Sequence, residues 1–550
     1  MRDYDTSVAF LGEWGRFQVI VFFMLCSTIL PNGTSSFSLV FVADTPAHHC
    51  LVPEVNLSQE WRETVIPMEE VNGELARSQC RRYRLDKVRN LSEMGVVPGR
   101  DVNLSSLEQE DCLDGWNYSR QLYQSTAVSE FDLVCNKRWR QPLTVTIFFL
   151  GVLVESFFSG VLSDRFGRKP VLFGTSVIQS VFSLALLASP SWEVFCVLLF
   201  CSGLGNISNY LSCYVLGTEI LTGNARVVYA SIGVFVAFAF GYMMLPLFAY
   251  FLRTWTGLTM ANALLGILYM PLWWFLPESP MWLLSQGRVA EAETIVRKAA
   301  KMNRVEAPEK IFADYIINAE TPEETFVQRY TLLDLLRRKR VAATTFIMTF
   351  LWFSQSLSYY GLTLNTSQLH SDPYISCFLS AVVELPAYFG TCFAVRFLPR
   401  RLAFLLTCLV SALSLFFIPL LPQSVLGVAV ALEMLGKFAI TAGTSILYFY
   451  CAELYPTGLR NTSTGMCSMG SRIGGCIAPF VLQLNFYVKH LTYVTMGSMA
   501  VLSAFPLLFM PESFGRPLPE TLEQMPKTQR LKCSCIARRE PSKHVMESKL

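Results

Sequence analysis

Long runs of apolar residues constrain this 550-residue sequence more than any other feature. Each run is about twenty residues long, the length at which an α-helix crosses the roughly 30 Å hydrocarbon core of a bilayer. The runs show none of the alternation that is typical of membrane barrel strands. Eight runs are strong, at 17–42, 141–162, 194–216, 227–251, 257–276, 341–363, 402–422 and 490–510. Four are weaker, at 170–189, 374–396, 425–450 and 463–486. The sequence predicts an all-α membrane protein with twelve transmembrane helices.

The composition supports this class and argues against an enzyme. Charged residues make up 16% of the chain, whereas a soluble protein has about 25%. Gly436-Lys437 lacks the rest of a phosphate-binding loop, and the five histidines show no metal-ligand spacing apart from the adjacent His48 and His49, which we interpret as part of a solvated loop. We therefore expect no ATP, no nucleic acid, no resident metal and no cofactor, so that ion or solute gradients drive any transport.

The first apolar run is too long for a cleaved signal peptide, and it contains the polar stretch "LPNGTSS". We interpret it as a retained transmembrane helix that is broken near Pro31, Asn32 and Gly33.

The hydrophilic segment 43–140 follows this run and has the signature of an oxidising compartment. It holds four cysteines, Cys50, Cys80, Cys112 and Cys135, and four glycosylation sequons, at Asn56, Asn90, Asn103 and Asn117. Such a set predicts disulfides and glycans outside the cytoplasm. The four cysteines allow three pairings, and the sequence does not choose among them.

Basic residues near the ends of the runs give the orientation. "DRFGRK", "LLRRKR" and "LPRR" all fall on one side, which the positive-inside rule assigns to the cytoplasm, and the sequons fall on the other side. The predicted organisation is a cytoplasmic N-terminus at 1–16, a first helix at 17–42, an extracellular loop at 43–140, helices 2–6 at 141–276, a cytoplasmic loop at 277–340, helices 7–12 at 341–510 and a cytoplasmic tail at 511–550.

An internal repeat divides the chain into two halves. Glu219 and Arg226 recur as Glu453 and Arg460 at an offset of 234 residues, and "PES" at 277–279 recurs at 511–513 with the same offset. Several matches at one offset indicate a duplicated six-helix unit. Two six-helix halves around a midplane cavity are the architecture of a major facilitator transporter.

The charged residues of these repeats are candidates for a cytoplasmic gate. A spacing of seven residues is two turns of helix, so each glutamate and arginine should point the same way. We interpret the set as a network that opens with the inner side, and static anchoring of the helix ends is the alternative. The candidates are Asp164, Arg165, Arg168, Glu219, Arg226, Glu453 and Arg460.

Long motifs along the chain resemble those of the organic cation and carnitine/ergothioneine transporters. They are "AFLGEWGRFQ", "DRFGRK", "ISNY", "GTEIL", "GYMMLPLFAYF", "LWWFLPESPMWLLSQGR", "KAAKMN", "AELYPTGLRN" and "LPETLEQM", and the match extends to about residue 526. The resemblance implies a plasma-membrane carrier of carnitine, acylcarnitines, ergothioneine or organic cations, sodium-coupled in some members. It also implies a small-molecule substrate, contact with membrane lipid and a monomeric transport unit.

Arg472 is a permanent charge inside the eleventh run. A mid-membrane charge costs about 2.5–3.5 kcal/mol on insertion scales, so it should face a wet cavity. Its planar fork of donors suits a carboxylate, and this position resembles an arginine in family members that carry anions and zwitterions. We predict that Arg472 binds a substrate carboxylate, with packing against backbone carbonyls as the alternative.

A quaternary ammonium has no N–H to donate, so we expect aromatic faces to hold the cationic end through cation–π attraction. Tyr210, Tyr242, Trp352 and Tyr448 are the predicted rings, and Gln179 is predicted to add a polar contact. The wider set of aromatic candidates is Tyr214, Tyr229, Phe235, Tyr359, Tyr360 and Tyr450.

Several polar residues in the apolar runs need separate explanations. Asn32 and Asn209 resemble sodium-linked positions of the family, and interhelical hydrogen bonding is the alternative. Glu155 stands where the family pattern has a small residue, and it would favour cationic substrates if it faced the cavity. Glu433 and Lys437 are four residues apart, which favours an ion pair between them.

The sequence leaves three alternatives open. A sodium-independent organic cation facilitator would share the same motifs. A non-transporting membrane receptor would share the same topology. The final Ser548-Lys549-Leu550 matches a peroxisomal address, which makes the peroxisomal membrane a minor alternative location.

Overall fold

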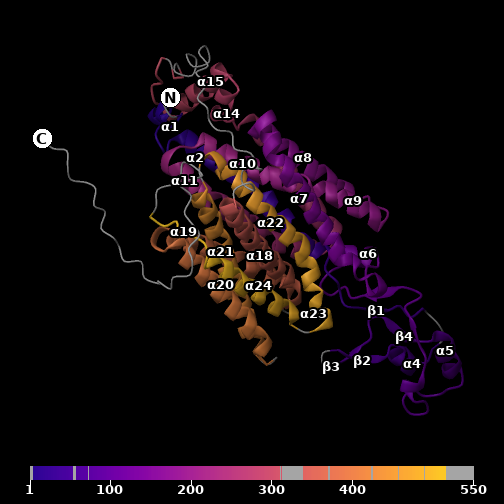
Figure 1. Cartoon of the computed structure of the whole chain (residues 1–550). Coiled ribbons are helices and arrows are strands. Elements are labelled where there is room, and N and C mark those ends of the chain that lie inside the picture. Colours follow the sequence, from indigo (N-terminus) through magenta and orange to yellow (C-terminus); the bar gives the residue numbers. More distant parts are fainter. Residues whose placement is uncertain are drawn as a thin grey trace.

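The computed structural model describes residues 4–53, 57–71, 74–309, 311–312, 339–369, 372–422, 425–455, 457–488 and 490–515. A bundle of long helices forms its body (Figure 1). A segment with short strands and two disulfides lies at one end of the bundle, and α14 (Pro280–Ser285), α15 (Val289–Asn303) and the N-terminus lie at the other end. The disulfide-bonded segment and the α14–α15 segment are therefore at opposite ends of the bundle.

The first half of the bundle contains the helices before residue 275. They are α1 (Tyr4–Ser7), η1 (Ala9–Leu11), α2 (Arg16–Phe37), α3 (Leu39–Val42), α7 (Arg140–Phe166), α8 (Arg168–Leu186), α9 (Trp192–Gly203), α10 (Asn206–Ile220), α11 (Gly223–Val228), η4 (Tyr229–Gly233), α12 (Val234–Leu252), α13 (Trp255–Leu268) and η5 (Met270–Trp274).

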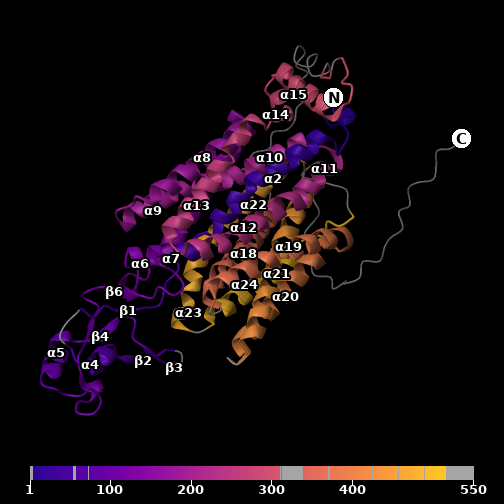
Figure 2. The same ribbon diagram turned by 180° about the vertical axis from the view of Figure 1, so that it is seen from behind.

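The second half packs beside the first, as the view from behind shows (Figure 2). Its elements are α18 (Lys339–Leu369), α19 (Pro373–Phe397), α20 (Arg400–Phe417), η6 (Ile418–Leu420), α21 (Leu426–Leu454), α22 (Thr457–Leu482), α23 (Leu484–Tyr487) and α24 (Leu491–Leu507).

Each of the twelve predicted runs coincides with one helix or with two or three consecutive helical elements. In the part of the chain that the structure describes, eight helical segments are long and apolar enough to cross a membrane. The remaining predicted runs correspond to α13 with η5, and to α18, α22 and α24. The twelve-helix prediction agrees with this arrangement.

The predicted break near Pro31 is wrong, because α2 continues through Pro31 to Phe37. The Thr34 hydroxyl donates to the Pro31 carbonyl at 2.9 Å. Gly33 has a packing role instead, since a Cβ there would lie 2.3 Å from the Phe238 carbonyl oxygen of α12. The glycine lets two helices touch through their backbones.

We expect Gly241→Ala to destabilise the protein, because its Cβ would lie 2.3 Å from the Leu30 carbonyl oxygen of α2. The helices would have to separate along their crossing, at a cost of at least about 2 kcal/mol. Surface abundance measured by antibody labelling should fall severalfold. Gly174→Ala in α8 is the matched control, since its Cβ would meet nothing within 4 Å. Equal abundance of both variants would contradict this account.

The disulfide-bonded segment contains three two-stranded antiparallel sheets, which the sequence analysis did not anticipate. The pairs are β1 (His48–Cys50) with β6 (Trp116–Tyr118), β2 (Met68–Val71) with β3 (Glu74–Arg77), and β4 (Arg81–Tyr83) with β5 (Gln109–Asp111). Short helices connect them: α4 (Gln59–Thr64), α5 (Leu85–Glu93), η2 (Leu104–Ser106), α6 (Ala127–Glu130) and η3 (Cys135–Lys137).

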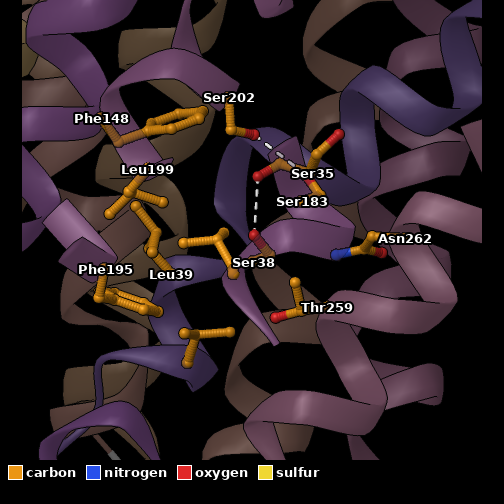
Figure 3. A pocket seen from close by; sticks show the side chains of 12 residues that line it. Ser35, Ser38, Leu39, Phe148, Ser183, Phe195, Leu199, Ser202, Thr259 and Asn262 are labelled. Carbon is orange, nitrogen blue, oxygen red and sulfur yellow. Dashed lines mark hydrogen bonds between the residues drawn. The ribbon is translucent and has the colours of Figure 1, made fainter. Parts of the chain in front are cut away.

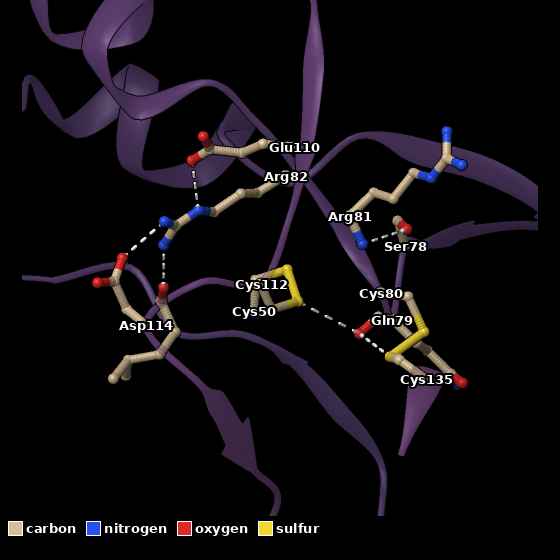
Figure 4. Close-up of a disulfide and its surroundings, with 11 residues drawn as sticks. Cys50, Ser78, Gln79, Cys80, Arg81, Arg82, Glu110, Cys112, Asp114 and Cys135 are labelled. Carbon is tan, nitrogen blue, oxygen red and sulfur yellow. Dashed lines mark hydrogen bonds and ion pairs between the residues drawn. A yellow bond between two sulfur atoms is a disulfide. The ribbon is translucent and has the colours of Figure 1, made fainter. Parts of the chain in front are cut away.

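Two disulfides and one buried arginine hold this segment together (Figure 4). Cys50 is bonded to Cys112 and Cys80 to Cys135, which settles the pairing that the sequence left open. Arg82 is 2% exposed and pairs with Glu110 at 2.9 Å and Asp114 at 2.6 Å. The predicted glycosylation residues Asn90, Asn103 and Asn117 are exposed, whereas Asn56 lies outside the described residues.

Candidate substrate cavity and charge networks

A cavity of about 140 Å³ lies between the two halves of the bundle. Helices α2, α7, α10 and α12 of the first half and α18, α19, α21 and α22 of the second half contribute to its wall. The wall consists of Asn32, Ser36, Phe148, Phe149, Val152, Asn206, Ile207, Tyr210, Phe235, Phe238, Trp352, Ser356, Tyr359, Tyr360, Tyr388, Thr441, Thr444, Ser445, Tyr448, Ser471 and Arg472. The wall is rich in aromatic rings, and Arg472 is its permanent charge.

Small residues around Arg472 bring its helix against α18. A Cβ on Gly470 or Gly474 would lie 2.3 Å and 2.6 Å from backbone carbonyl oxygens of α18. The Ser356 hydroxyl donates to the Ser471 carbonyl at 2.6 Å across the same contact. This close packing places the half-buried guanidinium in the cavity wall. The small residues therefore allow α22 to pack closely against α18, and Arg472 lines the cavity.

The Arg472 guanidinium shares the cavity wall with the tyrosine side chains of Tyr210, Tyr360 and Tyr448. Within the described part of the chain, no carboxylate forms an ion pair with it. A carboxylate brought into the cavity could therefore take the position that an internal partner would otherwise occupy.

Three of the four predicted rings line the cavity: Tyr210, Trp352 and Tyr448. The Trp352 and Tyr448 rings meet edge to face, with centroids 4.3 Å apart. Tyr242 does not line it, because this ring is buried against Phe37 and donates to the Ser380 hydroxyl at 3.2 Å. The face of α12 that carries Tyr242 packs on α2 and α19, which no periodicity of α12 alone reveals.

The sequence analysis missed Tyr388 and ranked Tyr359 low, although both line the cavity. Their hydroxyls donate to the two carboxylate oxygens of Glu384, at 3.1 Å and 2.7 Å respectively. The sequence does contain a signal for this contact, because Tyr388 follows Glu384 by one helical turn in an apolar run. A buried carboxylate thus fixes two rings of the wall.

The predicted ion pair between Glu433 and Lys437 is wrong. Lys437 pairs with Glu384 of α19 at 3.2 Å, and its ammonium lies 3.6 Å from the centroid of the Tyr359 ring. Glu433 instead accepts a hydrogen bond from the Tyr493 hydroxyl of α24 at 2.8 Å. Glu433 and Lys437 are one helical turn apart, as the spacing predicts, but each is bound by a residue of a neighbouring helix.

Gln179, Asn32 and Asn209 meet in a smaller hollow of about 10 Å³ inside the first half. Asn32 donates to the Asn209 side-chain oxygen at 2.8 Å, and Gln179 donates to the Ser35 hydroxyl at 2.9 Å. Gln179 therefore lies outside the wall of the central cavity, whereas Asn32 borders both spaces.

A neighbouring hollow of about 30 Å³ shares Asn262 with the one around Asn32 (Figure 3). Ser183 and Ser202 bond to each other there at 3.0 Å. The buried side-chain oxygen of Asn262 accepts no hydrogen bond from the described residues. The first half thus contains an oxygen-rich interior beside the central cavity.

Glu155 lies behind the wall of the central cavity. Its carboxylate oxygens accept the backbone N–H groups of Ile207 at 2.7 Å and Ser208 at 3.0 Å, in the first turn of α10. It is 6% exposed, and its neighbours Val152 and Ile207 line the cavity in its place. Glu155 does not face the cavity, so the condition under which we expected it to favour cationic substrates is not met in this structure.

The repeated charges form a similar network in each half. Arg168 at the start of α8 pairs with Glu219 at 3.1 Å, and its backbone N–H donates to Glu278 at 3.1 Å. Asp164 adds an ion pair to Arg168 at 2.9 Å. Burial raises the pKa of the Glu278 carboxyl, and hydrogen bonds from backbone N–H groups oppose this shift. Arg165 is exposed beside the ring of Phe166.

The second half repeats this arrangement with Arg400 at the start of α20. Arg400 pairs with Glu453 at 2.9 Å, and its backbone N–H donates to Glu512 at 2.9 Å. Both networks join helices within one half. Their geometry therefore fits rigid halves, and it leaves the predicted opening of the network as a hypothesis.

The expectation that Glu219 and Arg226 face one way is wrong. Helix α10 ends at Ile220 and α11 begins at Gly223, so the two-turn argument fails. Arg226 pairs with Asp5 of α1 at 2.8 Å. The same interruption separates Glu453 in α21 from Arg460 in α22, and the side chain of Arg460 is outside the described residues.

Comparisons with known proteins place these features in a family. The family model "Sugar (and other) transporter" matches residues 108–525. The chain is 48% identical to "Solute carrier family 22 member 4" of Mus musculus, covering 97% of this chain and 96% of that protein. It is 46% identical to "Organic cation/carnitine transporter 2" of Homo sapiens, covering 97% of this chain and 95% of that one. The chain belongs to the organic cation/carnitine transporter branch of the major facilitator superfamily.

The fold of this transporter agrees with solved structures. A partially occluded inward open conformation of the xylose transporter XylE from E. coli matches with a TM-score of 0.59 and 15% identity, covering 91% of this chain and 100% of that one. The family model and the sequence relatives confirm the resemblance found in the motifs. The chain is a multi-pass membrane transporter of small molecules and not an enzyme.

Proposed function

We propose that the transporter moves zwitterionic and cationic quaternary ammonium solutes, such as carnitine, acylcarnitines or ergothioneine, across the plasma membrane. The observation that carries the proposal is a guanidinium without an ion-paired carboxylate among the described residues, set in an aromatic wall. Arg472 would hold the substrate carboxylate, and the rings of Tyr210, Trp352 and Tyr448 would face the ammonium. The names of the carnitine-transporting relatives support the same substrate class.

Alternating access suits a cavity that both halves line. Cross-half hydrogen bonds join Thr146 to the Cys476 carbonyl at 2.8 Å and Gln483 to the Arg138 carbonyl at 3.1 Å. The second of these lies near the disulfide-bonded segment, which we assign to the extracellular side. Rocking of two rigid halves would break such bonds and open that side, while the charge networks within each half stay intact.

Sodium coupling is the finer part of the proposal. The hollow around Asn32, Asn209 and Asn262 has about the volume that one small solvent molecule or ion occupies. The unpartnered oxygen of Asn262 supplies a neutral ligand of the kind that sodium accepts. An ion there would sit beside Asn32, which also borders the central cavity, and so would stabilise the loaded carrier.

The test is an uptake panel of labelled carnitine, ergothioneine and tetraethylammonium in cells that express the chain. Each solute is measured in sodium and in N-methyl-D-glucamine, which avoids the quaternary ammonium of choline. We expect carnitine uptake to fall at least tenfold without sodium. Failure of all three solutes to accumulate above mock-transfected cells would contradict the proposal.

A sodium-independent organic cation facilitator is the second candidate. The hydrogen bond between Asn32 and Asn209 favours it, because these two side chains already satisfy each other without an ion. Uptake of tetraethylammonium that is unchanged by sodium replacement, together with no carnitine uptake, would select this candidate.

A further inference from the structure

A second and larger hollow lies at the end of the bundle next to the disulfide-bonded segment. Its volume is about 350 Å³, compared with about 140 Å³ for the central cavity, and no described residue lines both spaces. The first half contributes residues of α3 and α7 to its wall, and the second half contributes residues of α18, α22 and α23. We call this hollow the outer vestibule, because we assign the disulfide-bonded segment to the extracellular side.

Three helices run from the outer vestibule to the central cavity. Val145 and Phe149 lie one turn apart on α7, and the first lines the vestibule whereas the second lines the cavity. Leu364 and Tyr360 repeat this arrangement on α18. Helix α22 continues from the cavity to Leu482 in the vestibule wall. The two spaces therefore follow each other along the same helices.

Two contacts between the halves lie between these spaces. The Thr146 hydroxyl of α7 donates to the Cys476 carbonyl of α22 at 2.8 Å. The rings of Phe149 and Tyr360 meet edge to face, with centroids 4.7 Å apart. Both contacts would separate when the halves rock apart. A solute in the vestibule would then be on the path to Arg472, which lies about 15 Å of helix from the end of α22.

The vestibule wall contains a cation that suits a carboxylate. The guanidinium carbon of Arg138 lies 3.6 Å from the centroid of the Phe486 ring, across the boundary between the halves. Stacking on a ring uses the face of a guanidinium and directs its N–H donors to the edge, where a planar carboxylate binds. The Arg138 backbone is held at the same boundary, because its carbonyl accepts from the Gln483 amide at 3.1 Å.

The same wall contains a carboxylate, that of Asp44. Its oxygens accept the Tyr123 hydroxyl at 2.7 Å and the Thr45 backbone N–H at 2.9 Å, which fix the side chain at 6% exposure. A cation and a carboxylate in one hollow complement the two charges of a zwitterion. A solute that is purely cationic would instead be repelled by Arg138.

We propose that the outer vestibule is a second binding site for zwitterions, in which Arg138 holds the carboxylate before the solute reaches Arg472. The proposal rests on the proposed function, in which the solute carries a carboxylate and a quaternary ammonium. The vestibule is loaded while the contacts between the halves are closed, and their separation lets the solute move inward. Arg138 and Arg472 thus bind the same group of the solute in sequence.

The test measures occupancy of the vestibule by thiol protection. Thr45→Cys places a thiol in the vestibule wall, and a membrane-impermeant maleimide labels it from outside the cell. The chain also carries Arg472→Gln, so that carboxylate binding in the central cavity is removed. We expect carnitine to slow labelling saturably, by at least about threefold above twice the Kd of the vestibule. Tetraethylammonium, which has no carboxylate, should not slow it.

Further variants assign the protection to Arg138. Adding Arg138→Gln to the labelled chain should abolish the protection by carnitine. Arg120→Gln is the matched control, because it removes an exposed arginine of the disulfide-bonded segment that does not line the vestibule, and carnitine should still protect. In the otherwise unchanged transporter, Arg138→Gln should raise the carnitine KM about fivefold, the upper end for a charge pair in contact with water. It should not raise the tetraethylammonium KM.

The outcomes distinguish this inference from the proposed function. Absence of labelling at Thr45→Cys, or labelling that carnitine does not slow, would overturn the inference. Equal rises in KM for both solutes in Arg138→Gln and in Phe486→Leu would also overturn it, because Arg138 would then only hold the halves together. The proposed function has its own measurement, since it fails if Arg472→Gln alone leaves the carnitine KM unaltered, whatever the labelling shows.

Discussion

Replacing Arg472 by aspartate should abolish carnitine uptake while tetraethylammonium uptake continues. The substitution removes the fork of donors from the cavity wall and introduces a charge that repels the substrate carboxylate. Losing a desolvated charge pair costs about 2–5 kcal/mol, so we expect kcat/KM for carnitine to fall at least about thirtyfold. Initial rates of labelled uptake, normalised to surface protein, measure this effect.

Two further variants test whether carnitine uptake depends on the guanidinium group of Arg472. Arg472→Lys keeps the charge but loses the planar geometry, so carnitine uptake should be intermediate. Arg396→Gln removes an arginine at the end of α19 that lies beside Phe397, away from the cavity wall, and it should transport carnitine normally. An equal loss of carnitine and tetraethylammonium uptake in Arg472→Asp would contradict the carboxylate role.

Sequence alone could locate Arg472 because its signal is local. A charge within an apolar run must face polar surroundings whatever the neighbouring helices do. The helix runs and the duplicated halves are also properties of continuous sequence, and the structure agrees with them. The same is true of the oxidised cysteines, although only the fold decides that Cys50 meets Cys112.

The incorrect predictions share one cause, which is that partners come from other helices. The seven-residue spacing of Glu219 and Arg226 means two turns only if the helix continues, and this helix is interrupted between Ile220 and Gly223. Lys437 has Glu433 one turn away on its own helix but pairs with Glu384, 53 residues earlier in the chain. No periodicity within one run contains that information.

The Glu384–Lys437 pair leads to the second large expected effect, on stability. Both side chains are almost fully buried, at 0% and 1% exposure, and the Lys437 ammonium also donates to the Thr363 hydroxyl. Lys437→Met should destabilise the protein by about 3–5 kcal/mol, because it leaves the Glu384 carboxylate buried without its cation. We expect the midpoint of thermal unfolding to fall by several degrees.

Unfolding can be followed with a thiol-reactive dye, since Cys408 and Cys451 are buried free cysteines that become accessible on unfolding. The control Lys298→Met removes an exposed lysine of α15 and should leave the midpoint unchanged.

The double variant Glu384→Gln, Lys437→Met shows whether the uncompensated charge causes the loss of stability. Replacing both members of a buried pair is often neutral, so the double variant should recover most of the lost stability. If it is no more stable than Lys437→Met, the penalty comes from lost packing of the lysine stem against Tyr359, and the uncompensated charge is not responsible.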